Sequence, residues 1–122
     1  MAASVYDLYI EQGATFRMRV RLYDSSNQTL NLTGYTARSQ IRQTIVSTAI
    51  IHEMTTENGG IAITGASGYL DVTISDTITK AFKFTSPAVW DMELISPAST
   101  TPPNIVTRLL KGEVYLDLEV TR

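Results

Sequence analysis

The sequence contains no cysteine and a single histidine, His52. The absence of cysteine excludes disulfide bonds, thiolate nucleophiles and cysteine-ligated zinc, and one histidine excludes a metal site built from several. No stretch approaches the ~20 consecutive apolar residues that span a bilayer. The first seven residues lack the basic start and apolar run of a secretory signal. We therefore expect no metal, no cofactor and no membrane partner, and synthesis in a cytoplasm.

An excess of charge of either sign is also missing. The chain has 10 Lys+Arg and 12 Asp+Glu, which give a formal net charge of −2 over 122 residues. Proteins that bind nucleic acid by releasing counterions use many Lys and Arg contacts, so we expect no nucleic-acid partner. The length fits one domain of ~100–150 residues, and a hydrophobic fraction of 43% is ordinary for a globular protein. The sequence predicts a single domain over residues 1–122.

What the sequence does have is an alternation of apolar and polar residues with period two. Because successive side chains of a strand point to opposite faces, this alternation predicts strands with one buried face. The segments that show it are 14–23, 35–42, 69–75, 88–94 and 113–120. In the last of these, the side chains expected to point inward are Val114, Leu116, Leu118 and Val120.

Turn-forming residues separate these segments, and one segment departs from the alternation. Residues 75–82 begin with Ser75 and bring Ile78 and Phe82 to one side, which predicts one or two helical turns. Many short strands joined by turns predict an all-β fold. We expect an antiparallel, Ig-like β-sandwich with one short helical turn, in preference to a closed barrel, with Trp90 in its core. The alternation leaves the order of the strands open.

Groups that could perform chemistry are few. His52 and Glu53 are neighbours in a segment expected to be extended, so their side chains point to opposite faces and Glu53 cannot orient the imidazole. We interpret His52 as a partly exposed histidine at a sheet edge. The acids of 91–93 and 117–119 alternate onto an outward face, and neither a calcium-binding loop nor a phosphate-binding loop occurs. The sequence predicts no catalytic residue and no enzyme.

The most distinctive polar feature is a row of arginines at Arg17, Arg19 and Arg21. Guanidiniums at every second position line one face of a strand over ~13 Å. One interpretation is a surface for an acidic partner, because arginine is enriched at protein interfaces. The other is cross-strand pairing with acids near the C-terminus. Those acids are Glu113, Asp117 and Glu119. The residues predicted to form an interface are Arg17, Arg19, Arg21, Arg38, Arg42, Tyr69 and Tyr115.

Short signatures follow one another along the chain in a fixed order. They are 10–16 (IEQGATF), 30–38 (LNLTGYTAR) with 40–42 (QIR), 55–61 (TTENGGI), 68–74 (GYLDVTI), 90–94 (WDMEL), 107–112 (TRLLKG) and 120–122 (VTR). This series resembles that of small β-sandwich virion structural proteins of tailed phages, in particular the N-terminal domain of the phage baseplate upper protein family. The resemblance spans nearly the whole chain. It departs from the family pattern at Asn31, where relatives often carry aspartate.

The resemblance implies a non-enzymatic structural component of a virion, assembled through symmetric contacts with other virion proteins and with copies of itself. It favours the tail or baseplate, or an adaptor through which fibres attach; capsid decoration and carbohydrate binding are the alternatives. Residues 1–5 precede the first strand and are expected either to reach a neighbouring subunit as an arm or to fray. The expected location is the virion.

Overall fold

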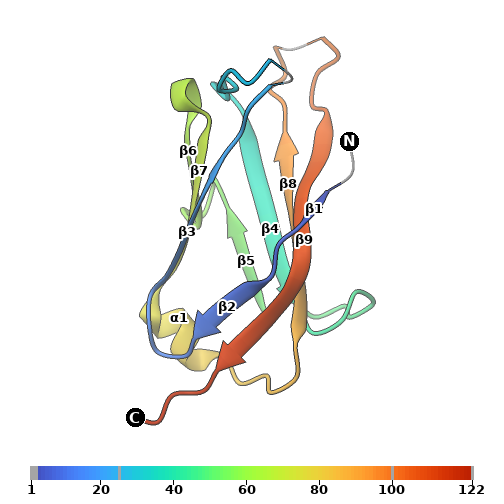
Figure 1. Ribbon diagram of the computed structural model, residues 1–122. Coiled ribbons are helices and arrows are strands. Elements are labelled where there is room, and N and C mark those ends of the chain that lie inside the picture. Colours follow the sequence, from blue (N-terminus) through green and yellow to red (C-terminus); the bar gives the residue numbers. More distant parts are fainter. Residues whose placement is uncertain (1–2, 25, 100, 122) are drawn as a thin grey trace.

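The computed structural model describes residues 3–24, 26–99 and 101–121, whose strands form two sheets that pack face to face (Figure 1). The strands are β1 (Ser4–Val5), β2 (Leu8–Glu11), β3 (Phe16–Arg21), β4 (Thr36–Arg42), β5 (His52–Thr55), β6 (Ile61–Thr64), β7 (Tyr69–Ile74), β8 (Ala88–Ile95) and β9 (Val106–Asp117). The helices are α1 (Asp76–Ala81) and the 3-10 helix η1 (Gly65–Ser67). Neither helix of the described chain is long and apolar enough to cross a membrane.

The strand order defines the fold. One sheet has the order β1-β9-β8-β4-β5, with β2 also paired to β9, and the other has the order β3-β7-β6. This division of strands is that of an immunoglobulin-like sandwich, so the predicted all-β, Ig-like fold is confirmed and the barrel is excluded. One detail differs from the expectation of an antiparallel fold. β1 and β2 run parallel to β9, while the other strand pairs of the described chain are antiparallel.

The core lies between the two sheets and is built by the alternation visible in the sequence. The inward side chains of β7 and β8 are all buried: Leu70, Val72, Ile74, Ala88, Trp90, Met92 and Leu94. The segments predicted at 14–23, 35–42, 69–75 and 88–94 correspond to β3, β4, β7 and β8, with ends shifted by no more than two residues. Leu32, which precedes β4, closes the core at the crossing from one sheet to the other.

Trp90 fixes how the N-terminal segment lies on its sheet. The side chain is 4% exposed, as predicted, and its Nε1 donates a hydrogen bond of 2.8 Å to the backbone carbonyl of Tyr6. Gly112, the cross-strand neighbour of Trp90, leaves room for this approach, because a Cβ at that position would meet the Tyr6 carbonyl. The backbone N–H of Tyr6 donates to the carbonyl of Lys111 at 2.8 Å. These contacts hold β1 and β2 against β9.

The predicted helical segment is confirmed as α1. Ser75 is its N-cap, and the Ser75 hydroxyl accepts a hydrogen bond of 3.3 Å from the Ile78 N–H. Thr79 is fully buried; its Oγ1 donates to the Ala14 carbonyl at 2.8 Å and accepts from the Gly13 N–H at 3.1 Å. Gly13 has a φ of +85°, which only glycine adopts without strain. α1 therefore fixes the turn that carries the chain from β2 to β3.

Both ends of the chain correct an expectation. Ser4 and Val5, expected to belong either to an arm that reaches a neighbouring subunit or to a frayed end, pair in parallel with Leu110 and Lys111 of the same chain; Met1 and Ala2 lie outside the described residues. At the other end, β9 stops at Asp117 and the chain leaves the sheet. The predicted inward side chains beyond that point are therefore exposed, Leu118 by 51% and Val120 by 90%. Arg122, the last residue of the final signature, lies outside the described residues.

Candidate interaction surfaces

The arginine row lies on the outer face of the three-stranded sheet. In β3 the exposed residues Arg17, Arg19 and Arg21 alternate with partly buried apolar ones, as predicted. β7 runs beside them with Asp71 opposite Arg19 and Tyr69 opposite Arg21. We call these five residues the arginine–tyrosine face. Three arginines and one aspartate leave it positively charged.

The partner of the row is not the one considered from the sequence. Arg19 binds Asp71 with two hydrogen bonds, Nε to Oδ1 at 2.7 Å and Nη2 to Oδ2 at 3.3 Å, and this ion pair raises the pKa of the Arg19 guanidinium. Glu113 and Asp117 belong to β9 in the other sheet, and Glu119 follows β9. Pairing of the row with these three acids within one chain is therefore excluded.

Tyr69 organises the rest of the row. The guanidinium carbon of Arg19 lies 4.5 Å from the centre of the Tyr69 ring, and that of Arg21 lies 4.6 Å from it. Tyr23 adds a second ring at 5.7 Å from Arg21. Cation–π contacts of this kind contribute about 0.5–1 kcal/mol each at exposed sites. Arg17 makes no hydrogen bond or ion pair within the described residues through its side chain, so its charge faces solvent.

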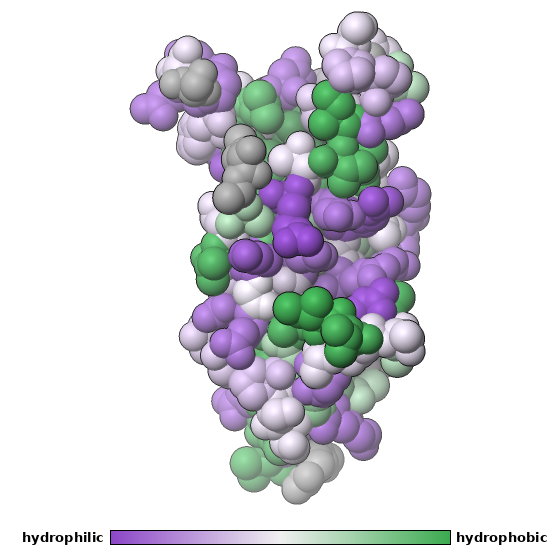
Figure 2. Space-filling view, turned by 90° about the vertical axis from the view of Figure 1, so that its right-hand side faces the viewer, coloured by the Kyte–Doolittle hydropathy of each residue, from purple (hydrophilic) through white to green (hydrophobic). Residues whose placement is uncertain are grey.

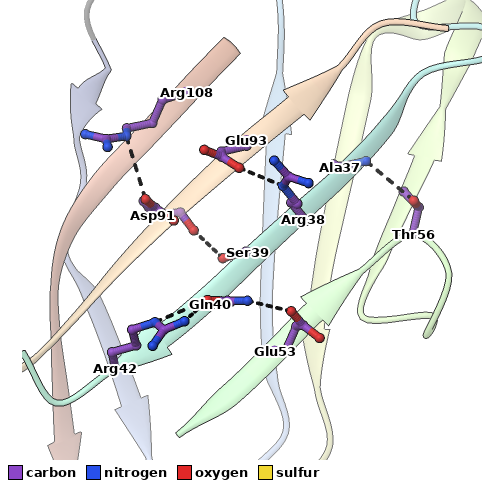
Figure 3. Close-up of polar contacts among 10 residues, drawn as sticks. All are labelled: Ala37, Arg38, Ser39, Gln40, Arg42, Glu53, Thr56, Asp91, Glu93 and Arg108. Carbon is purple, nitrogen blue, oxygen red and sulfur yellow. Dashed lines mark hydrogen bonds and ion pairs between the residues drawn. The ribbon is translucent and has the colours of Figure 1, made fainter. Parts of the chain in front are cut away.

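Arg38 and Arg42 lie on the other sheet, and the structure does not bring them together with the row of β3. Figure 3 shows their surroundings on the outer face of β4, β8 and β9. Arg38 Nε pairs with Glu93 Oε1 at 2.7 Å, and Arg108 Nε pairs with Asp91 Oδ2 at 3.7 Å. Partial burial, then the charge of Glu93, raise the pKa of Asp91 despite the nearby arginines. The charges of this region largely satisfy one another.

The side chain of Arg42 binds the loop that follows β4. Its Nη1 donates to the carbonyls of Ser47 at 2.7 Å and Thr48 at 3.1 Å, while Nε and Nη2 donate to Gln40 Oε1. These bonds hold the loop of residues 43–51 in place. The loop presents Ile45 and Val46, which are 85% and 88% exposed. The sequence reasoning overlooked this apolar pair, although its position inside a run of polar turn residues was a usable signal.

The loop also shapes the side of the molecule that it projects from. Ile45 helps line a groove of about 560 Å³ together with Val5, Arg42, Val89 and other residues of β1, β4, β8 and β9. Figure 2 shows this side, with apolar side chains in separate groups and hydrophilic ones between them. The apolar surface is therefore divided rather than continuous.

Tyr115 lies on the outer face of the six-stranded sheet, whereas Tyr69 belongs to the other sheet. Its ring stacks on that of Tyr9, with centroids 5.1 Å apart and planes at 11°. β2 and β9 place Tyr9 beside Tyr115 and Glu11 beside Asp117, and Glu113 precedes this pair on β9. Partial desolvation, then the carboxylate of Glu113, raise the pKa of the Tyr115 phenol. We call Tyr9, Glu11, Glu113, Tyr115 and Asp117 the tyrosine–acid face.

Two members of this face, Tyr9 and Glu11, were missed in the sequence. The signal was the alternation of apolar Leu8 and Ile10 with Tyr9 and Glu11; the structure buries the first two and exposes the other two. What the alternation could not show was that β2 adds in parallel to β9, which is what brings Tyr9 against Tyr115.

His52 occupies the edge strand β5, as predicted, and is partly exposed. Its ring centroid lies 6.0 Å from that of Phe82, and burial lowers the pKa of the imidazole. Glu53 points away and accepts a hydrogen bond of 2.7 Å from Gln40 Nε2. In the described part of the chain, no three His, Asp or Glu side chains are grouped so that they could hold a metal ion.

Comparison with known proteins leaves the family open. No protein-family model matches the chain, and no curated protein matches it. Among solved structures, the chain is similar to the extracellular domain of the voltage-gated sodium channel beta4 subunit, with a TM-score of 0.40, 10% identity and 97% of each chain covered. That domain forms parallel homodimers that explain its role in cell–cell adhesion. A similarity this weak says nothing about the function of the present chain.

Proposed function

We propose that this protein is a non-enzymatic structural component of a tailed-phage virion. Its place is the tail or baseplate, or an adaptor that attaches fibres, and it works through contacts with other virion proteins and with copies of itself. The observation that carries the proposal is the ordered series of signatures from residue 10 to residue 122, which resembles the family of the phage baseplate upper protein.

The positions of the signature residues support this proposal. Gln12, in the first signature, donates from Nε2 to the Phe82 carbonyl at 2.7 Å, and its Oε1 accepts from the Glu119 N–H at 2.8 Å. Leu32, in the second, is fully buried. Both residues join distant parts of the chain, so the matched signatures include side chains on which the sandwich depends.

The outer surfaces support an assembly role. Guanidiniums fixed against tyrosine rings present charge without needing much further ordering on contact, and residues of both types are enriched at protein interfaces. Tyr69 holds Arg19 and Arg21 in this way. Small proteins of a particle gain their binding energy from many such contacts repeated by symmetry.

The direct test is to find the protein in purified particles. Labelled protein seen by electron microscopy at the tail tip or collar, in tens of copies or fewer, would support the proposal; the copy number is an order-of-magnitude expectation from closed symmetry. An even shell over the head would favour capsid decoration instead. Absence from intact particles, with the protein confirmed in the infected-cell lysate, would overturn a virion role of either kind.

Carbohydrate binding is a second candidate, because the stacked pair of Tyr9 and Tyr115 is the kind of exposed aromatic surface that sugars contact. The pair has 11° between its planes and the Tyr9 side is 70% exposed. A glycan array with wild-type protein and the Tyr9→Ala variant tests this directly. Binding lost in the variant would support it, and no binding to any glycan would retire it.

A further inference from the structure

The arginine–tyrosine face and the tyrosine–acid face carry charges of opposite sign, although the outer surface of the six-stranded sheet also carries Arg38, Arg42 and Arg108. The arginine–tyrosine face belongs to the β3-β7-β6 sheet, and the tyrosine–acid face belongs to β2 and β9 of the other sheet. The two sheets pack through their inner sides (Figure 1), so these faces lie on opposite sides of one molecule. The two faces of one copy cannot touch each other, but each can contact the opposite face of a second copy.

The spacing of the charges matches on the two faces. Arg17 and Arg21 stand four residues apart on β3, and Glu113 and Asp117 stand four residues apart on β9. At ~3.3 Å per residue, each pair spans ~13 Å. The middle position of the first row is Arg19, and the middle position of the second is Tyr115.

The ends of the two rows also lie at the same end of the sandwich. β2 ends at Glu11, and a short turn leads into β3, where Arg17 is the second residue. Glu11 is paired with Asp117 in the register of β2 and β9. Figure 1 shows this turn at the lower end, next to the end of β9. A second copy placed over the first without inversion therefore sets Arg17 near Glu11 and Asp117, and Arg21 near Glu113.

The charges at the ends of each row remain available for such a contact. Among the described residues, no ion pair or hydrogen bond involves the side chain of Arg17, Glu11 or Asp117. Glu113 accepts one hydrogen bond of 3.3 Å, from the Tyr115 hydroxyl. Arg21 donates one hydrogen bond of 3.3 Å from Nε to the Ser67 carbonyl but forms no ion pair among the described residues. Arg19, in the middle of the row, forms an ion pair with Asp71.

We propose that copies of this chain stack face to back, with the arginine–tyrosine face of one copy on the tyrosine–acid face of the next. The proposal deepens the assembly role given above and rests on it for its place in a virion. Such a contact is heterologous, so it generates a ring or a helical stack rather than a two-fold dimer. Because the sheets of a sandwich cross at about 30°, each copy is rotated relative to the last.

The experiment uses purified full-length protein in analytical ultracentrifugation at concentrations up to about 1 mM. Wild-type protein should form species larger than dimers, and these should weaken as salt rises from about 0.05 M to 0.5 M, because the Debye length falls below ~10 Å. Arg17→Glu and Asp117→Lys should each weaken association at least about tenfold. Lys83→Glu and Glu57→Lys are matched controls, since they make the same charge changes at exposed residues outside both faces.

Mixing the variants identifies the geometry. Arg17→Glu protein keeps an intact tyrosine–acid face, and Asp117→Lys protein keeps an intact arginine–tyrosine face. In a mixture of the two, the intact faces pair with each other and the two reversed charges meet across the next contact. Larger species should therefore form again, and the two changes combined in one chain should restore them as well. Circular dichroism of each variant shows that the sandwich is intact.

Several results would overturn the stacking. One is that the wild-type protein is a monomer at every concentration, and another is that neither salt nor the two variants affect its association. A third is a two-fold dimer that is lost in each variant and is not restored when the two variants are mixed. Loss of DNA or vesicle binding in Arg17→Glu, with self-association unchanged, would assign the arginines to another partner. None of these results bears on whether the protein is found in particles, so the stacking and the virion role fail separately.

Discussion

Replacement of Thr79 by valine tests whether one buried hydroxyl holds the turn that leads into the arginine row. The Thr79 Oγ1 donates to the Ala14 carbonyl at 2.8 Å and accepts from the Gly13 N–H at 3.1 Å. Valine has nearly the same shape and makes neither bond. Each hydrogen bond contributes about 1 kcal/mol net, and a buried donor left without a partner costs about 1–3 kcal/mol. We expect Thr79→Val to lower the free energy of unfolding by about 2–4 kcal/mol.

This loss is a large part of the total stability, because a chain of 122 residues has a free energy of unfolding of about 6–18 kcal/mol. Urea unfolding followed by fluorescence measures it, since Trp90 is the one tryptophan and is buried. Thr77→Val is the matched control, with the same substitution at an exposed position of the same helix and an expected change within about 0.5 kcal/mol. Equal free energies of unfolding for the two variants would refute the reasoning.

Three further predictions concern ionisation and close packing. Burial lowers the pKa of His52, so the unfolded state takes up its proton first; stability should fall from about pH 7.5 to pH 5.5, and His52→Gln should remove that part of the fall. Burial and the charge of Glu93 raise the pKa of Asp91, so its charged form is unfavourable in the fold. Asp91→Asn should therefore raise the melting temperature at about pH 7 but not at about pH 3, and a lower value at neutral pH would contradict this. Gly112→Ala places a Cβ against the Tyr6 carbonyl and should cost about 1–3 kcal/mol in urea unfolding; unchanged stability would show that the N-terminal segment moves freely.

Local patterns in the sequence were sufficient to place most of the elements. The alternation of Arg17 and its neighbours predicts the exposed face of β3 and places its ends within two residues, because side-chain direction in a strand depends only on position. Ser75 marks the start of α1 for an equally local reason, since its hydroxyl caps a backbone N–H three residues away. The alternation failed at Leu118 and Val120, because apolar residues continue the pattern after the strand has left its sheet.

The surfaces, in contrast, depend on which strands become neighbours. Arg19 pairs with Asp71, and Tyr9 stacks on Tyr115, across gaps in the sequence that no local pattern spans. The same applies to the separation of Arg38 from the arginine row, which follows from the assignment of β3 and β4 to different sheets.

The sequence by itself therefore determined that this chain forms strands, which of their side chains turn outward, and where a short helix interrupts them. Only the tertiary structure decided that the arginines of β3 and the acids of β9 lie on opposite outer faces. The physical reason is that the direction of a side chain is set by its own backbone, whereas its neighbours are set by hydrogen-bonded pairing between distant segments.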